Sequence, residues 1–138
     1  MVPDSGELNA SLVAGAGEAA RHWPDARPVA LCGDLPALRA AELADALALV
    51  PADEPAFVTD AEAVGTTLYT APYELFTPSF GPGSAAAHRA LGAVLLDGAG
   101  AGLRGDVDDR AALDHAGTLG LGPHTTAALA AQTKVAGP

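Results

Sequence analysis

Three short polar segments stand out in this alanine-rich chain because their residue types could do chemistry together. Residues 65–68 read Gly-Thr-Thr-Leu, residues 80–88 read Phe-Gly-Pro-Gly-Ser-Ala-Ala-Ala-His, and residues 103–108 read Leu-Arg-Gly-Asp-Val-Asp. The first supplies hydroxyls, the second a glycine-rich turn before a helix, and the third two carboxylates two residues apart. Backbone amides at a helix start bind phosphate oxygens, and carboxylates bind hard metal ions. Together the segments suit a phosphorylated ligand held beside a divalent cation.

The candidate metal ligands, which are also the candidate catalytic residues, are Asp34, Asp106 and Asp108. Asp34 lies in a Gly-Asp-Leu-Pro turn after the apolar run 28–32, at the carboxyl end of a predicted strand. In an extended segment the side chains of Asp106 and Asp108 point to the same face, so they could bind one cation together or lie on either side of two cations. The sequence leaves other roles open, because Asp34 is also a turn-forming residue and either Asp108 or Asp109 is predicted to cap the following helix.

The candidate anion-binding residues are Gly81, Gly83 and Ser84, which precede a predicted helix. Their backbone amides and the serine hydroxyl could bind a phosphate group with support from the helix dipole. Thr66 and Thr67 add two further hydroxyls. The alternative is a proline-glycine turn followed by an ordinary serine cap. The segment is not a P-loop, since it lacks the lysine that such a loop requires.

Two other reactive side chains receive different interpretations. His88 lies four residues after Ser84 on the same helix face, so it could face the ligand. Cys32 is best interpreted as a small core residue rather than as a nucleophile.

The elements that must position these residues follow from hydrophobic periodicity and from the placement of proline and glycine. Helices are predicted at 9–23, 39–50, 84–91, 108–119 and 124–132, and strands at 28–32, 56–60, 66–70 and 93–96. The uninterrupted apolar run 28–32 is typical of a strand buried on both faces of a parallel sheet. Residues 71–82 predict an irregular surface loop, and the glycine-rich residues 98–102 a flexible connector. This alternation predicts an α/β sheet flanked by helices, in a single domain over 1–138.

Composition limits the possible partners. A net charge of −10 with only seven basic residues argues against nucleic acid and an anionic membrane surface as partners. A phosphorylated ligand would therefore need a divalent cation for much of its neutralisation. One cysteine excludes an internal disulfide, and neither a membrane-length apolar run nor signal-peptide features at the start are present. These features predict a cytoplasmic protein.

Taken in order, the segments resemble the phospholactate or phosphoenolpyruvate guanylyltransferases. The resemblance extends to residues 119–125, Leu-Gly-Leu-Gly-Pro-His-Thr, and covers about residues 2–129. It implies a three-layer Rossmann-like nucleotidyltransferase sheet and a reaction in deazaflavin coenzyme biosynthesis. In that reaction the phosphate of the three-carbon acid attacks the α-phosphorus of GTP and releases pyrophosphate. By matching position, the resemblance implies Asp34, Asp106 and Asp108 as Mg²⁺ ligands, and Thr66 or Thr67, Gly81 and Ser84 as acceptor-binding residues.

The chain also departs from the family pattern. The last motif is usually closer to Leu-Arg-Arg-Asp-Val-Asp-Thr, so Gly105 and Asp109 replace a basic and a hydroxyl side chain. Family members begin with a strand and a basic nucleotide loop before the segment equivalent to residues 2–9, and Lys134 is the sole lysine here. The resemblance therefore predicts an N-terminally truncated domain, the carboxyl-terminal two-thirds of a nucleotidyltransferase. The alternatives are an inactive remnant that binds phosphate and metal, and a molybdopterin-type nucleotidyltransferase, which residues 80–88 disfavour.

Overall fold

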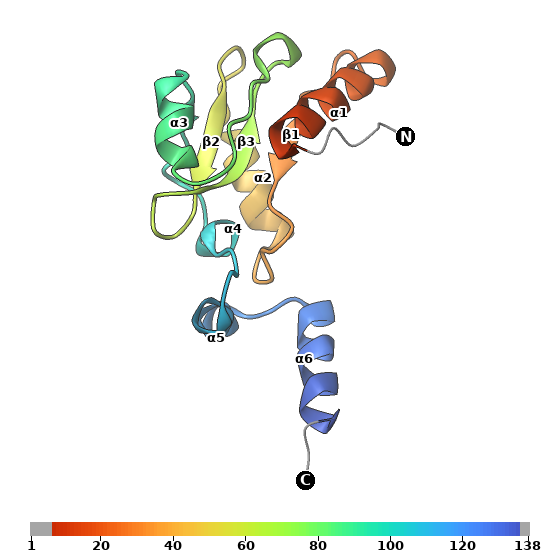
Figure 1. Cartoon of the computed structure of the whole chain (residues 1–138), viewed down its shortest axis with the longest axis vertical. Coiled ribbons are helices and arrows are strands. Elements are labelled where there is room, and N and C mark those ends of the chain that lie inside the picture. Colours follow the sequence, from red (N-terminus) through yellow and green to blue (C-terminus); the bar gives the residue numbers. More distant parts are fainter. Residues whose placement is uncertain (1–6, 136–138) are drawn as a thin grey trace.

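The computed structural model describes residues 7–135, in which helices and strands alternate as predicted for an α/β fold (Figure 1). The strands are β1 (Val29–Leu31), β2 (Ala56–Thr59), β3 (Thr66–Thr70) and β4 (Val94–Leu95). The helices are α1 (Leu8–His22), α2 (Ala40–Ala48), the 3-10 helix η1 (Tyr73–Leu75), α3 (Ser84–Ala90), α4 (Ala101–Arg104), α5 (Arg110–Leu119) and α6 (Pro123–Val135). The predicted fold class is confirmed.

The four strands form one open, mixed sheet in the order β1-β3-β2-β4. β3 is antiparallel to both β1 and β2, whereas β2 and β4 are parallel. The register places Phe57 opposite Tyr69 and Val58 opposite Leu68. Because β3 is antiparallel to both neighbours, β1 and β2 run in the same direction. The segment β1-α2-β2 is therefore a strand-helix-strand unit with parallel strands, and β3 is inserted between them.

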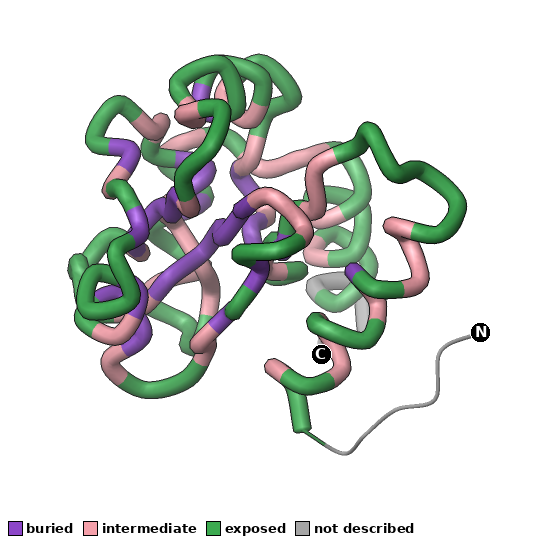
Figure 2. The backbone as a smooth tube through the Cα atoms, turned by 90° about the horizontal axis from the view of Figure 1, so that it is seen from above, coloured by how far each residue is buried: buried purple, intermediate pink, exposed green. Residues whose placement is uncertain are grey.

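Side-chain alternation along the strands divides the core into two clusters, one on each face of the sheet. On one face, Phe57 and Tyr69 pack with residues of α1 and α3. On the other face, Val58 and Leu68 pack with residues of α2 and with Leu103 of α4. The molecule therefore has three layers, and its buried residues concentrate on the central strands (Figure 2).

The prediction that residues 28–32 form a strand buried on both faces of a parallel sheet is wrong. β1 lies at an edge of the sheet and, among the described residues, pairs only with the antiparallel β3. Val29 is 40% exposed and Leu31 is 39% exposed, whereas Ala30 between them is buried. An apolar run identifies a strand, but it does not specify how many neighbours cover it.

Three other predictions need correction. The loop 71–82 does not lie over the surface throughout, because Phe76 is buried with its ring centroid 5.5 Å from that of Tyr69. The connector 98–102 includes the start of α4. Ser84 is the first residue of α3 rather than its cap, since the cap position belongs to Gly83, whose φ of 72° is left-handed. The cap prediction for α5 is confirmed at Asp109, whose carboxylate accepts a hydrogen bond from Ala112 N.

Among the described residues, no helix is both long and apolar enough to cross a membrane. The predicted absence of a signal peptide depends on the first residues of the chain, and residues 1–6 lie outside the described range.

Candidate functional site

The carboxylates predicted as metal ligands come from two loops that the fold brings together. Asp34 follows β1, and residues 106–108 lie between α4 and α5. The backbone amide of Val107 donates a hydrogen bond of 3.1 Å to the carbonyl oxygen of Asp34. This contact fixes Asp106 and Asp108 next to the Asp34 turn.

The carboxylates lie close enough to affect one another. Partial burial is the largest cause that raises the pKa of Asp106, and the negative charges of Asp60, Asp108 and Asp34 raise this pKa further. A hydrogen bond from a backbone amide acts in the opposite direction. Burial and, to a smaller extent, the negative potential of the neighbouring carboxylates disfavour the charged form of Asp106, and the same potential attracts cations.

Asp60 is a member of this carboxylate cluster that sequence reasoning missed. It follows β2, lines a cavity of about 420 Å³ with Asp106 and Asp108, and accepts hydrogen bonds from the amides of Val64 (2.9 Å) and Gly65 (2.6 Å). A Cβ atom on Gly65 would overlap the Asp60 carboxylate, which explains the glycine at the start of the Gly-Thr-Thr-Leu segment. The available signal was an aspartate at the end of a predicted strand, five residues before a glycine.

The donor chemistry of the cluster fits a hard divalent cation. Mg²⁺ is usually held by one or two carboxylates, with water and substrate phosphates as the remaining ligands. Within residues 7–135, no three histidine, cysteine or acidic side chains are arranged so that they could together hold one ion. Asp34 lines a neighbouring cavity of about 450 Å³ rather than the cavity of Asp106 and Asp108. The cluster therefore fits a cation that shares its coordination with ligand oxygens.

Cys32 connects the carboxylates to the two threonines. Its amide donates a hydrogen bond of 2.9 Å to the carbonyl of Thr67, and its thiol donates one of 3.5 Å to the carbonyl of Thr66. Burial, followed by the charges of Asp34 and the other carboxylates, raises the pKa of the thiol to about 11. The group is therefore a neutral thiol at physiological pH, in agreement with its interpretation as a packing residue rather than a nucleophile.

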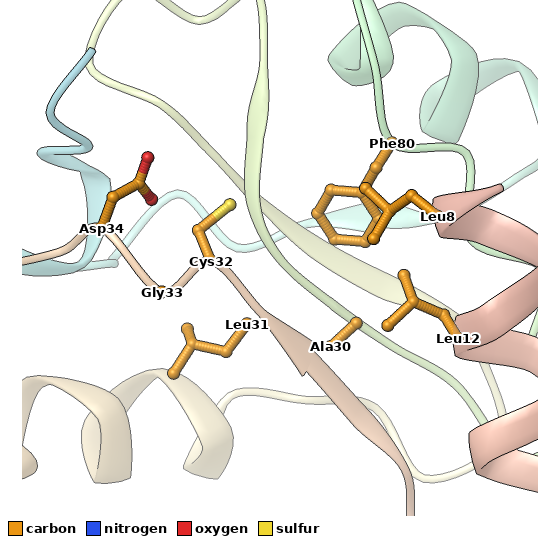
Figure 3. Close-up of a pocket in the computed structure, with 8 residues that line it drawn as sticks. All are labelled: Leu8, Leu12, Ala30, Leu31, Cys32, Gly33, Asp34 and Phe80. Atoms are coloured by element: carbon orange, nitrogen blue, oxygen red, sulfur yellow. The ribbon is translucent and has the colours of Figure 1, made fainter. Parts of the chain in front are cut away.

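An apolar groove extends from Asp34 along β1 to α1. Its volume is about 410 Å³, and its lining residues include Leu8, Leu12, Leu31 and Phe80. Figure 3 shows Asp34 and Cys32 at one end of the groove and Phe80, Leu8 and Leu12 at the other.

The predicted hydroxyl pair lies at the beginning of β3. Thr66 and Thr67 are both buried, at 6% and 0% exposure. The Thr66 hydroxyl is 2.9 Å from Nδ1 of His88. The Thr67 hydroxyl is fully buried and has no hydrogen-bond partner among the described residues. A buried hydroxyl without a partner is uncommon in native proteins, and a ligand oxygen could satisfy it.

The predicted anion-binding turn is adjacent to this pair. The amide of Ala85 donates a hydrogen bond of 3.1 Å to the carbonyl of Val64, which directly precedes the Gly-Thr-Thr-Leu segment. Gly81 and Gly83 both have positive φ angles, of 132° and 72°, so this turn conformation requires glycine. Ser84 is buried, whereas Gly81 is exposed.

The structure places His88 inside the core and not toward a ligand. The residue is 0% exposed, and its ring is stacked on Tyr69 with 4.6 Å between the centroids. Its Nε2 accepts a hydrogen bond of 2.9 Å from the amide of Ser79, and its Nδ1 contacts Thr66. Since both ring nitrogens bind protein groups, any influence of His88 on a ligand must be transmitted through its partners.

Comparison with known proteins identifies close sequence relatives. No protein-family model matches the chain. The chain is 50% identical over 108 residues to a curated phosphoenolpyruvate guanylyltransferase from Geodermatophilus obscurus, covering 78% of this chain and 50% of the relative. Proteins of the same name from Thermomonospora curvata and Streptomyces coelicolor are 48% and 47% identical and cover 99% and 96% of this chain. The chain spans only 60% and 63% of the length of these two relatives.

Proposed function

Because the chain belongs by sequence to the phosphoenolpyruvate guanylyltransferase family, we propose that it contributes to guanylyl transfer from GTP to a phosphorylated three-carbon acid. The acceptor is phosphoenolpyruvate or 2-phospho-L-lactate, the products are the guanylylated acid and pyrophosphate, and the reaction serves deazaflavin coenzyme biosynthesis in the cytoplasm. The observation that carries the proposal is 47–48% identity over nearly the whole chain.

In the proposed reaction, a phosphate oxygen of the acceptor forms a bond to the α-phosphorus of GTP. The bond between the α-phosphorus and the bridging oxygen breaks, and pyrophosphate leaves with the electron pair of that bond. Such a transfer needs alignment and charge neutralisation rather than a protein nucleophile. The neutral thiol of Cys32 is consistent with this requirement.

We assign Mg²⁺ to the cluster of Asp34, Asp106 and Asp108, where one or two of the carboxylates would bind the ion and phosphate oxygens or water would complete its coordination. Bound there, the ion would act as a Lewis acid that neutralises charge on the phosphate oxygens. The assignment is supported by the contact between Val107 and the Asp34 turn, and by the mutual influence of the carboxylates on the pKa of Asp106.

We assign the acceptor anion to the two threonines and the adjacent glycine-rich turn. The unpartnered hydroxyl of Thr67 supplies a hydrogen-bond donor. In the turn, Gly81 and Gly83 supply backbone amides and Ser84 supplies its hydroxyl, because the amide of Ser84 already donates to the carbonyl of Gly81. The bond between Ala85 and Val64 supports this grouping because it holds the turn against the beginning of β3. The two assigned groups, for metal and acceptor, are connected through Cys32.

The direct test measures pyrophosphate release from GTP and Mg²⁺ with phosphoenolpyruvate or 2-phospho-L-lactate in turn. We expect release with one of the two acids and not in the absence of an acceptor. A folded protein that releases no pyrophosphate with either acid would reject catalysis by this polypeptide. If that protein still binds the acid and Mg²⁺, the result would favour a non-catalytic binding module.

Asp106→Asn tests the assigned metal role. The substitution removes one carboxylate and nearly preserves side-chain shape, so we expect at least a tenfold loss of pyrophosphate release and weaker Mg²⁺ binding, typical of a lost metal contact. The control is Asp45→Asn, which removes an exposed carboxylate from α2 and should leave both quantities unchanged. Activity that survives Asp106→Asn would contradict the metal assignment.

A further inference from the structure

The hydrogen bonds of His88 determine which ring nitrogen carries the proton. The amide of Ser79 can only donate, and it points to Nε2 at 2.9 Å, so Nε2 must be the unprotonated nitrogen. A neutral imidazole then has its hydrogen on Nδ1. This hydrogen is donated to the Thr66 hydroxyl oxygen, which lies 2.9 Å away.

The surroundings of His88 hold this arrangement in place. The ring is stacked on Tyr69 with 19° between the planes, and Phe80 meets its edge with 5.6 Å between centroids. Burial lowers the pKa of the imidazole, although an interaction with the backbone of Ser84 opposes this effect. The neutral ring therefore persists at physiological pH, with little room to rotate and exchange its nitrogens.

The consequence concerns the proton of Thr66. Because its oxygen accepts the hydrogen from His88, its own hydroxyl hydrogen cannot point to the ring and must point elsewhere. The phosphate and carboxylate groups of the proposed acceptor offer only oxygen acceptors at neutral pH, so they need donors. Resting on the proposed function, we infer that His88 is a positioning residue that presents the Thr66 hydroxyl as a hydrogen-bond donor to the acceptor anion.

His88 also fixes the chain that leads into the glycine-rich turn. Its Nε2 holds the amide of Ser79, and the next residue, Phe80, is bonded through both its amide (2.8 Å) and its carbonyl (2.9 Å) to the side chain of Asn9. The same imidazole thus connects both groups of residues that we assign to the acceptor, the threonines of β3 and the turn that begins at Gly81.

The first experiment determines the tautomer of His88 and does not depend on enzyme activity. Long-range ¹H–¹⁵N correlation spectra of the wild-type protein distinguish protonated from unprotonated imidazole nitrogens. We expect His88 to show a protonated Nδ1 and an unprotonated Nε2. The opposite tautomer, or a doubly protonated ring at neutral pH, would overturn the inference.

The second experiment separates the two hydrogen bonds of the ring by amide replacement. In His88→Asn the side-chain amide reaches the place of Nδ1 and can still donate to Thr66. In His88→Gln the amide reaches the place of Nε2 and can only replace the bond to Ser79. Both variants lose the aromatic stacking, so comparing them isolates the bond to Thr66.

We expect His88→Gln to weaken phosphoenolpyruvate or 2-phospho-L-lactate binding about tenfold or more, the typical effect of losing a hydrogen bond to a charged group. His88→Asn should retain most of the affinity. In the Thr66→Val background, His88→Gln should cause little further loss, because the two residues act as one unit. Equal losses in the Asn and Gln variants, or additive losses with Thr66→Val, would contradict the positioning role.

The two proposals fail in different ways. If folded wild-type protein has the expected tautomer but binds neither acid, the acceptor assignment fails and the role of Thr66 fails with it. If the protein binds one of the acids but His88 has the other tautomer, only the inference about His88 fails.

Discussion

At the scale of single residues, the polar groups buried between β3 and α3 are satisfied mainly by one another. His88 and Thr66 form a side-chain pair within a core that is otherwise built of aromatic and small apolar residues. A buried polar group is stabilised only when it is hydrogen-bonded in the folded state. The neutral form of His88 is therefore part of the fold, and protonation of the ring should affect stability.

We predict that the free energy of unfolding decreases as the pH falls below about 6.5 and that His88 causes part of this decrease. In the unfolded chain the imidazole takes up a proton near its ordinary pKa of 6.5, whereas burial lowers the pKa in the folded protein. The unfolded state then binds more protons, so stability is lost as the pH falls through the folded-state pKa and is fully present above 6.5.

Urea unfolding between about pH 7.5 and about pH 5, the range in which histidine titrates, measures this slope. His88→Gln should flatten the pH dependence. The control His115→Gln removes an exposed histidine of α5, and it should change the slope less than His88→Gln does. Tyr69, which stacks on the ring, and Arg89, which lies over the neighbouring Phe57 ring, are retained in both variants. An unchanged slope in His88→Gln would contradict the prediction.

At the scale of elements, one carboxylate joins the starts of two helices on the same face of the sheet. Glu42 of α2 accepts hydrogen bonds from the amides of Arg39 (3.1 Å) and Gly102 of α4 (3.0 Å). The packing is close, because a Cβ atom on Gly102 would lie 2.5 Å from the carbonyl oxygen of Ala37. Since α4 leads directly into residues 106–108, this contact between helices helps to position the proposed metal ligands.

We predict that Glu42→Ala lowers the free energy of unfolding by about 1–3 kcal/mol, because it leaves the partly buried amide of Gly102 without its partner. Gly102→Ala should destabilise at least as much, since the added methyl group meets a backbone oxygen that cannot rotate away. Asp45→Ala, at an exposed position of the same helix α2, serves as the control and should change stability little. Urea denaturation compares the three variants. A Glu42→Ala protein as stable as the control would refute the proposed connection.

This contact illustrates what the sequence could and could not predict. Hydrophobic periodicity located the helices and strands, and the Asp109 cap was confirmed because capping depends on local geometry. The glycines at 98–102 predicted a flexible connector, yet Gly102 is required there by the close approach of Ala37 and Glu42. A flexible backbone and the close packing of neighbouring atoms both favour glycine, so the sequence alone does not show which of the two reasons applies.

For the candidate site, the types and spacing of the residues were informative, but their surroundings were not. The spacing of Asp106 and Asp108 identified a carboxylate pair, and the fold brings it to Asp34. The participation of Asp60 depends on a turn geometry that appears only in three dimensions. His88 was expected to face a ligand because helical spacing gives a face but does not reveal that this face is buried.

At the scale of the whole molecule, two opposing properties determine how copies of the chain interact. The sheet ends in β1, an edge strand with Val29 and Leu31 exposed beside the apolar groove. Unprotected edges of this kind favour pairing with another strand. The net charge of −10 opposes association through electrostatic repulsion. Salt weakens this repulsion, since the Debye length falls from about 30 Å at 0.01 M to about 10 Å at 0.1 M ionic strength. The apolar contact between edge strands is not screened in this way.

We therefore predict that the chain associates with itself as salt and protein concentration rise, and that Leu31→Lys suppresses this association. A lysine on an edge strand is a common natural protection, because its charge must be desolvated before another strand can pair. Sedimentation velocity at low and high salt measures the effect. Leu91→Lys, which adds the same charge at an exposed position after α3, is the control and should still associate at high salt. Equal suppression by both substitutions would show that net charge, and not the β1 edge, causes the effect. A wild-type protein that remains monomeric at high salt would contradict the prediction.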